Sequence, residues 1–156
     1  MRIAVEQWME EPLRRFIDDS RVRLVLLLET SGRVLAQHGF TRSLDVMSAC
    51  ALAAAIHASS GELGRQLEGR PFRGLHHAGR DRQLFLAEAQ TQRGSFIVLT
   101  VFDQESSLGL VRMYFDEFAR RLAAAAPPPV RRTEPVLEQH FERDLNKNLA
   151  TLFGRA

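Results

Sequence analysis

Two runs of consecutive apolar residues, 22–29 and 95–102, constrain the fold most strongly. Both are rich in β-branched and aliphatic residues and are shorter than a typical buried helix, so we predict that both are strands. A strand that is apolar at consecutive positions, and not only at alternate ones, is buried on both faces of its sheet. We therefore expect a sheet that is covered by helices on both sides.

Turn residues place three more strands around these two. Residues 34–38 follow the first run after Thr30, Ser31 and Gly32, which predicts a β-hairpin. Residues 72–78 and 83–90 precede the second run, with turns expected at 80–82 and 92–94. The sequence therefore predicts five strands.

Three helices are expected in the same region. Residues 5–19 have helical spacing, but Pro12 requires either a kink or a helix that begins near Glu10. Residues 44–67 are rich in alanine and lack proline, which predicts a long helix with an apolar stripe of Ala49, Leu52, Ile56, Leu63 and Leu67. The third helix should follow a cap at Ser106 or Ser107, with a stripe of Leu108, Val111, Phe115, Phe118, Leu122 and Ala125. The element order is αββαβββα, an α/β (α+β) protein.

The chain is divided by a proline-rich stretch. We predict one domain at residues 1–126, a stiff linker at 127–135 and an amphipathic helix within 136–156. The apolar side of this last helix must be buried against its own domain, a second copy of the chain or a different protein.

Composition excludes several classes of function. The net charge is only +2, and the basic residues are spread along the chain, so no nucleic-acid surface is predicted. The single cysteine, Cys50, has no internal disulfide partner, and no apolar run is long enough to span a membrane. We expect a cytoplasmic protein.

The residues offer no convincing catalytic, metal or cofactor site. His76 and His77 are adjacent on a predicted strand, so their side chains point to opposite faces and cannot share a metal ion. His57 has no second ligand four residues away, and no glycine-rich loop ends in Lys-Ser or Lys-Thr. We expect a binding protein and not an enzyme.

One face of the long helix suggests association. It carries Ala51, Ala54, Ala55 and Ala58, small residues that would let another backbone approach closely. The alternative is that these alanines pack tightly on the sheet of their own domain.

Several motifs together resemble the roadblock/LC7 family. They are the αββαβββα order, the hairpin at Thr30, the segment Leu63-Gly64-Arg65-Gln66-Leu67, and Val101-Phe102-Asp103 followed by Ser107-Leu108-Gly109-Leu110-Val111-Arg112. The last block is similar to the MglB branch, and the segment Asp144 to Gly154, which contains Leu152-Phe153, is similar to the MglB tail. Ser31 and the absence of Asn from 51–58 depart from that branch.

The resemblance implies a fold and a dimer. It implies a five-stranded antiparallel sheet with the long helix on one face and the first and third helices on the other. Family members form homodimers in which the strand at 72–78 pairs with its twin and the long helices lie side by side. By this resemblance the dimer interface contains Phe72, Leu75, His76 and His77.

The resemblance also implies a partner. Proteins of the MglB branch bind a Ras-like small GTPase of the MglA type on the paired long helices and accelerate GTP hydrolysis in cell polarity or motility control. Their tail helix also touches the GTPase and favours nucleotide exchange. The matching positions here are Ala51, Ala54, Ala55, Ala58 and Glu62 on the long helix, and Leu145, Leu149 and Phe153 on the tail. The alternatives are a scaffold without GTPase-activating activity and a small-molecule sensor.

Overall fold

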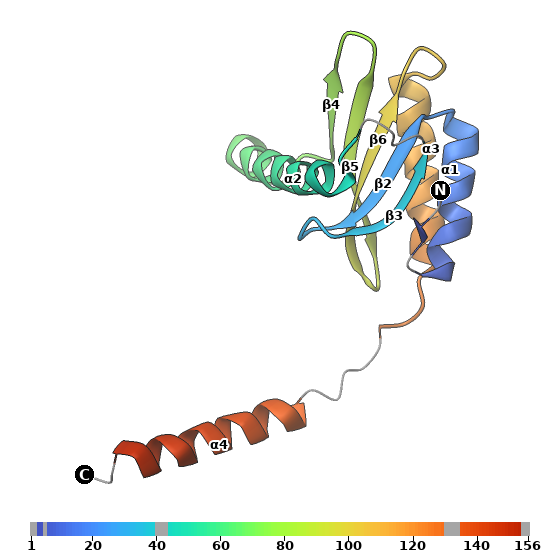
Figure 1. Ribbon diagram of the computed structural model, residues 1–156. Coiled ribbons are helices and arrows are strands. Elements are labelled where there is room, and N and C mark those ends of the chain that lie inside the picture. The colour runs from blue at the N-terminus through green and yellow to red at the C-terminus, as the bar shows by residue number, and fades with distance from the viewer. Residues whose placement is uncertain (1–2, 5, 40–43, 130–134, 154–156) are drawn as a thin grey trace.

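A computed structural model describes residues 3–4, 6–39, 44–129 and 135–153, and side chains within the last range are described at 141, 143–152 only. Helices lie on both faces of one antiparallel sheet (Figure 1). The predicted order of elements is present. The helices are α1 (Glu10–Ser20), α2 (Val46–Glu68), α3 (Leu108–Ala125) and α4 (Pro135–Phe153), with a 3₁₀ turn η1 (Gln7–Met9) before α1.

The sheet contains the five predicted strands and a short sixth. Its spatial order is β1-β3-β2-β6-β5-β4, and every neighbouring pair is antiparallel. The two apolar runs, β2 and β6, pair with each other in the middle, which explains their burial on both faces. The strands are β1 (Ile3–Ala4), β2 (Leu24–Glu29), β3 (Val34–Gly39), β4 (Gly74–Ala78), β5 (Gln83–Thr91) and β6 (Gly94–Phe102).

Helices α1 and α3 cover one face with large side chains. Phe16 lies 5.2 Å from Phe118 and Phe85 lies 5.5 Å from Phe115, measured between ring centroids. This cluster continues onto the inward side chains of β2 and β6, such as Val25 and Val98, which are fully buried. The predicted stripe of α3 is buried at Val111, Phe115, Phe118 and Leu122. This face is the larger part of the core.

Helix α2 covers the opposite face. Beneath it lie aliphatic side chains of the central strands, which alternate with those that face α1 and α3. They are Leu24, Leu26, Leu28, Leu86, Ile97 and Leu99. The expectation of helices on both faces is therefore confirmed.

The helix ends follow ordinary capping chemistry. The carboxylate of Asp45 accepts a hydrogen bond from the Ser48 amide at the start of α2, over 3.3 Å. The Ser107 hydroxyl accepts one from the Leu110 amide at the start of α3, over 3.2 Å, so Ser107 and not Ser106 is the cap. Helix α1 begins at Glu10, and Pro12 therefore lies in its first turn and causes no kink.

Candidate partner-binding surface

Helix α2 packs on the sheet through its smallest residues. Cys50, Ala53 and Gly64 are its buried positions. A Cβ atom added to Gly64 would lie 2.5 Å from the Phe72 amide nitrogen and 2.8 Å from the Arg70 carbonyl oxygen, so only glycine permits the chain to return this close to the helix. Burial also raises the pKa of the Cys50 thiol, which is typical of an unreactive core cysteine.

The large apolar residues of α2 point away from the sheet. Leu52, Leu63 and Leu67 are 63%, 51% and 68% exposed, and Ile56 is 37% exposed. We call Leu52, Ile56, Leu63 and Leu67 the leucine flank. At about 100° per residue, this flank lies roughly a quarter turn from the buried side of the helix. Of the stripe predicted from the sequence, Ala49 packs on the core beneath α2, whereas the four larger residues of the leucine flank do not.

The predicted alanine face lies on the other side of α2, and we call Ala51, Ala54, Ala55, Ala58 and Glu62 the alanine flank. Ala54 is half-buried, because the β2–β3 turn packs beneath it with Gly32 close to Ala51 and Ala54. The remaining positions of the flank are exposed. Ala54 therefore packs on its own domain, as the alternative interpretation of these alanines predicts. The other positions of the flank are open for association.

One polar contact connects α2 to the sheet. His57 Nε2 lies 2.8 Å from Glu88 Oε2 on β5, and both side chains are partly buried. Burial alone would raise the pKa of Glu88, but hydrogen bonds from Ser95, His57 and Gln90 outweigh it, and the pKa is lowered. Sequence reasoning missed this pair, since 31 residues separate its members.

Strand β4 forms an edge of the sheet within the described part of the chain, as it pairs with β5 alone. Leu75 pairs with Leu86 and faces α2, whereas His76 pairs with Phe85 and stacks on Phe102 at 6.2 Å. His77 is exposed on the α2 side. The two histidines thus point to opposite faces as predicted, and Phe72 lies half-buried before the strand begins.

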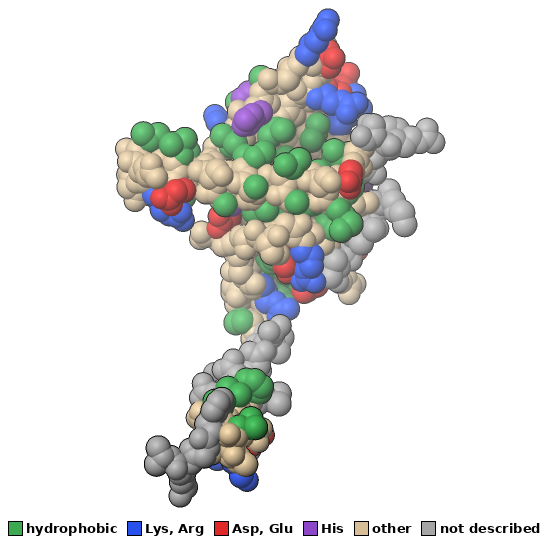
Figure 2. Space-filling model, turned by 60° about the vertical axis from the view of Figure 1, so that its left-hand side comes forward, with side chains coloured by type: hydrophobic (Ala, Val, Ile, Leu, Met, Phe, Trp, Pro, Cys, Tyr) green, Lys and Arg blue, Asp and Glu red, His purple; other side chains and the backbone are tan. Residues whose placement is uncertain are grey.

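The leucine flank and β4 lie on the same side of α2. Figure 1 shows β4 rising beside α2, with the β2–β3 turn on the opposite side of the helix. In Figure 2, apolar side chains gather along this side of α2 and over the sheet next to the histidines. Apolar side chains of the helix and of the sheet near β4 thus lie on the same side of the molecule.

Helix α4 presents a second exposed apolar surface. It lies apart from the domain in Figure 1, and Phe141, Leu145, Leu149 and Leu152 are 67%, 47%, 42% and 77% exposed. The predicted partner residues Leu145 and Leu149 belong to this row. The Phe153 side chain lies outside the described residues.

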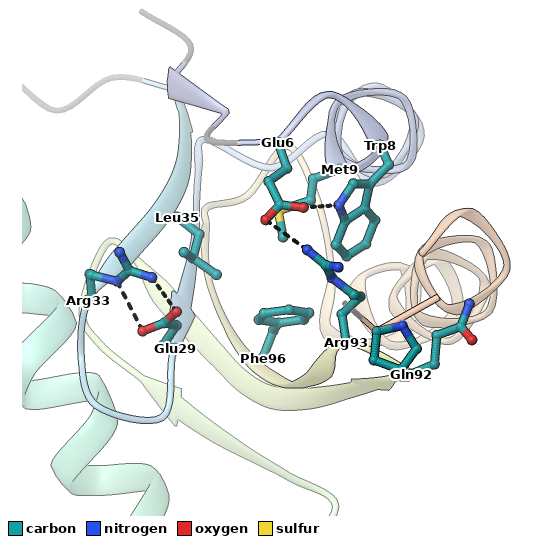
Figure 3. Close-up of a pocket in the computed structure, with 10 residues that line it drawn as sticks. Glu6, Trp8, Met9, Glu29, Arg33, Leu35, Gln92, Arg93 and Phe96 are labelled. Carbon is teal, nitrogen blue, oxygen red and sulfur yellow. Dashed lines mark hydrogen bonds and ion pairs between the residues drawn. The ribbon is translucent and has the colours of Figure 1, made fainter. Parts of the chain in front are cut away.

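A pocket of about 490 Å³ lies near the end of α3, between η1, the β2–β3 hairpin and the β5–β6 turn. Figure 3 shows Leu35 and Phe96 lining it, with an ion pair on either side, Arg33 with Glu29 and Arg93 with Glu6. Because each arginine is already paired with a carboxylate, the pocket does not favour the small-molecule sensor.

Two further observations concern ligands and membranes. Among the described residues, no group of three or more His, Cys, Asp or Glu side chains is placed to hold a metal ion. Helix α2 is long and apolar enough to cross a membrane by length and composition alone, with a mean hydropathy of 1.2. Its contacts with the sheet and the His57 to Glu88 bond identify it instead as a helix of the folded domain.

Comparison with protein families gives one clear match. The sequence model of the Roadblock/LC7 domain matches residues 9–103, which runs from η1 to the end of the sheet. A search of curated proteins found no match.

Solved structures with the same fold include two MglB proteins. MglB from Myxococcus xanthus has a TM-score of 0.69 at 23% identity, covering 76% of this chain and 94% of its own. The gliding protein MglB from Thermus thermophilus has a TM-score of 0.67 at 24% identity, covering 77% and 89%. A roadblock/LC7 domain from Streptomyces avermitilis has a TM-score of 0.61 at 15% identity, covering 78% and 97%. At these identities the likeness concerns the fold.

Proposed function

Because this chain belongs to the roadblock/LC7 family, we propose that it is a non-enzymatic cytoplasmic regulator that binds, as a homodimer, a Ras-like small GTPase of the MglA type. Its role is to accelerate GTP hydrolysis by that partner in cell polarity or motility control, with the tail helix promoting nucleotide exchange. The observation that carries the proposal is the way α2 packs on its sheet. Small residues of α2 face the sheet, and its leucine flank and alanine flank face away from the sheet.

The leucine flank supports the homodimer. Leucines that are more than half exposed in a row on one helix are unusual for a monomer, and association would remove them from water. Among the described residues, no strand pairs with the outer edge of the neighbouring β4, so its backbone donors and acceptors can pair with an antiparallel twin strand. A two-fold axis beside β4 would bring Phe72, Leu75, His76 and His77 of both copies together and cover both leucine flanks.

The alanine flank is the proposed GTPase surface. It remains open when the leucine flank is covered, since the two lie on different sides of α2. Small side chains at Ala51, Ala55 and Ala58 allow a partner's backbone to approach, and Glu62 at the end of the flank is exposed for a polar contact. Binding here would favour the hydrolysis-competent arrangement of the partner's own switch loops, a population shift that needs no catalytic residue from this chain.

The proposal is tested by single-turnover GTP hydrolysis of the cognate GTPase with saturating wild-type protein or with Ala55→Arg. A long charged side chain on the alanine flank should block close approach, so stimulation should fall at least ten-fold. Arg112→Ala, on the exposed side of α3, is the matched control and should stimulate like the wild type. Light scattering should show an unchanged dimer for both variants. Failure of the wild-type protein to accelerate hydrolysis at saturating binding would remove the activating role.

The exposed row on α4 favours a second candidate, a scaffold that links the GTPase to another protein through its tail. The two candidates differ when the chain is truncated from Pro127 onward. Retained stimulation of hydrolysis with lost exchange or recruitment would make the tail an accessory contact of a regulator. A truncated dimer that still binds the GTPase, together with a wild-type protein that never changes its turnover, would support the scaffold.

A further inference from the structure

The first residues after α3 are held by side chains from a distant turn. The Gln92 side-chain amide donates a hydrogen bond to the Ala126 carbonyl oxygen over 2.5 Å. The Arg93 guanidinium donates one to the Pro128 carbonyl oxygen over 3.3 Å. Both donors lie in the two-residue turn between β5 and β6, more than thirty positions earlier in the chain.

This turn is itself braced. The Thr91 hydroxyl accepts a hydrogen bond from the Arg93 amide and donates one to the Gly94 carbonyl oxygen, each over 3.0 Å. Gly94 has a φ of 119°, a conformation that side-chain-bearing residues rarely adopt, so the turn geometry depends on this glycine. The two donors therefore come from a defined backbone and not from a loose loop.

A second support acts on Arg93 from the N-terminal side. Its guanidinium lies 3.6 Å from the Glu6 carboxylate, which also accepts a hydrogen bond from the Trp8 indole. Trp8 in turn packs on Phe96 with their centroids 6.1 Å apart. Figure 3 shows Glu6 between the indole and the guanidinium. The Arg93 side chain is 23% exposed, so solvent weakens these contacts less than it would on an open surface.

The held segment is stiff. Residues 127–129 are consecutive prolines, each with a restricted φ and without an amide hydrogen. Because the segment is stiff and accepts one hydrogen bond at Ala126 and another at Pro128, its direction is fixed. If the segment turned about one of these hydrogen bonds, the other would break. From these contacts we infer that Gln92 and Arg93, supported by Glu6, form a clamp that fixes the start of the linker and thereby aims α4.

The clamp limits how far α4 can reach. With Pro129 fixed, residues 130–134 alone separate the anchored segment from α4, and five extended residues span at most about 17 Å. Without the clamp, Ala126 stays buried with its amide bonded to the Leu122 carbonyl oxygen, so the pivot moves back to Ala126 and residues 127–134 span up to about 27 Å. Releasing the clamp should thus raise the reach roughly 1.6-fold. It should lower the effective concentration of α4 near a site that both linkers can span about two-fold, because this concentration falls roughly as the −3/2 power of linker length.

The test measures the position of α4 on the full-length protein alone, so its outcome does not depend on the proposed GTPase. Spin labels are placed at Arg120→Cys on α3 and Asn148→Cys on α4, both exposed positions. Cys50 is fully buried and should stay unlabelled, which labelling of the wild-type chain checks. An excess of unlabelled chain removes distances between two copies, and pulsed electron resonance then gives the distance distribution.

We expect Gln92→Ala with Arg93→Ala to broaden this distribution about 1.6-fold, in proportion to the longer reach, and Gln92→Ala alone to broaden it less. Arg112→Ala is the control and should leave the width unchanged. Circular dichroism should show that all variants remain folded, as both clamp side chains lie in a turn outside the core clusters. An unchanged width in the folded double variant would overturn the clamp.

Discussion

The two faces of the sheet are closed by opposite means. Helices α1 and α3 cover one face with aromatic side chains that are almost entirely buried, such as Phe16, Phe115 and Phe118. Helix α2 covers the other face with Cys50, Ala53 and Gly64 and keeps its leucines outside. On the first face, the large side chains of the helices are buried within one chain. On the second face, the large side chains of α2 stay exposed and are available to contact another molecule. We infer that stability rests mainly on the first face and association on the second.

The largest expected effect tests the first half of that comparison. Phe118→Ala removes a fully buried ring that contacts Phe16 and Phe115, so the free energy of unfolding should fall by about 3–5 kcal/mol. Urea denaturation followed by circular dichroism measures it. Leu67→Ala, the matched change on α2, should cost less than about 1 kcal/mol in a dilute, dissociated sample. Equal losses in the two variants would remove the distinction between the faces.

A second prediction concerns the close packing of α2. Gly64→Ala would place a Cβ atom against backbone atoms of residues 70 and 72, which cannot move aside as a flexible side chain can. The free energy of unfolding should fall by about 1–3 kcal/mol. Gly69→Ala is a useful contrast, because its cost would come from its φ of 75° and not from a clash. Thermal denaturation measures this loss. A Gly64→Ala variant as stable as the wild type would show that residues 70–72 can move away from the helix.

The leucine flank should matter for assembly and little for folding. Leu63→Asp places a charge on the proposed dimer surface while leaving the buried side of α2 intact. We expect the dimer dissociation constant to rise at least ten-fold, about 1.4 kcal/mol, as measured by sedimentation over a concentration series. Met113→Asp, an exposed apolar position on α3, should leave the dimer unchanged. A fully dimeric Leu63→Asp protein would exclude the leucine flank from the interface.

The smallest expected effect is a pH dependence at the contact between α2 and β5. The pKa of Glu88 is lowered in the folded protein, so its contribution to stability is present above the ordinary glutamate pKa and is lost as pH falls through the lowered value. Glu88→Gln should cost about 1 kcal/mol near neutral pH. This difference should shrink in urea denaturation carried out about two pH units below the ordinary pKa. If the difference in unfolding free energy between the wild type and Glu88→Gln did not change with pH, the effect would come from packing and not from the charge of Glu88.

Several features were predictable because they depend on neighbouring residues. A serine before an apolar helical stripe is a local signal, which narrowed the cap of α3 to Ser106 or Ser107, and the structure has Ser107. Pro12 likewise left only a kink or a start near Glu10 for α1, and the structure has the start at Glu10. The consecutive apolar residues of β2 and β6 predicted helices on both faces of the sheet. These inferences need no knowledge of distant contacts.

The orientation of α2 was not predictable in this way. Periodicity shows that Leu52, Ile56, Leu63 and Leu67 share a side, but it does not show which side meets the sheet. The leucines of β2 and the apolar residues of β6 already fill the space beneath α2, so the helix approaches through small residues. Cys50, Ala53, His57 and Gly64, spaced by three, four and seven, were the available signal. The hydrogen bond from Gln92 to Ala126 joins residues that only the tertiary fold brings together, so no local pattern in the sequence predicts it.

The length of α2 has a consequence for how such a protein can change over time. Its 23 residues extend about 34 Å, whereas six strands at about 4.8 Å spacing are about 24 Å across, so the helix projects past the sheet in Figure 1. Apart from Gly64, the second half of α2 has no buried position among its residues. Substitutions there carry little penalty in folding and can alter which surface is recognised. The projecting half is thus the part of the molecule in which new partner preferences can arise at the lowest structural cost.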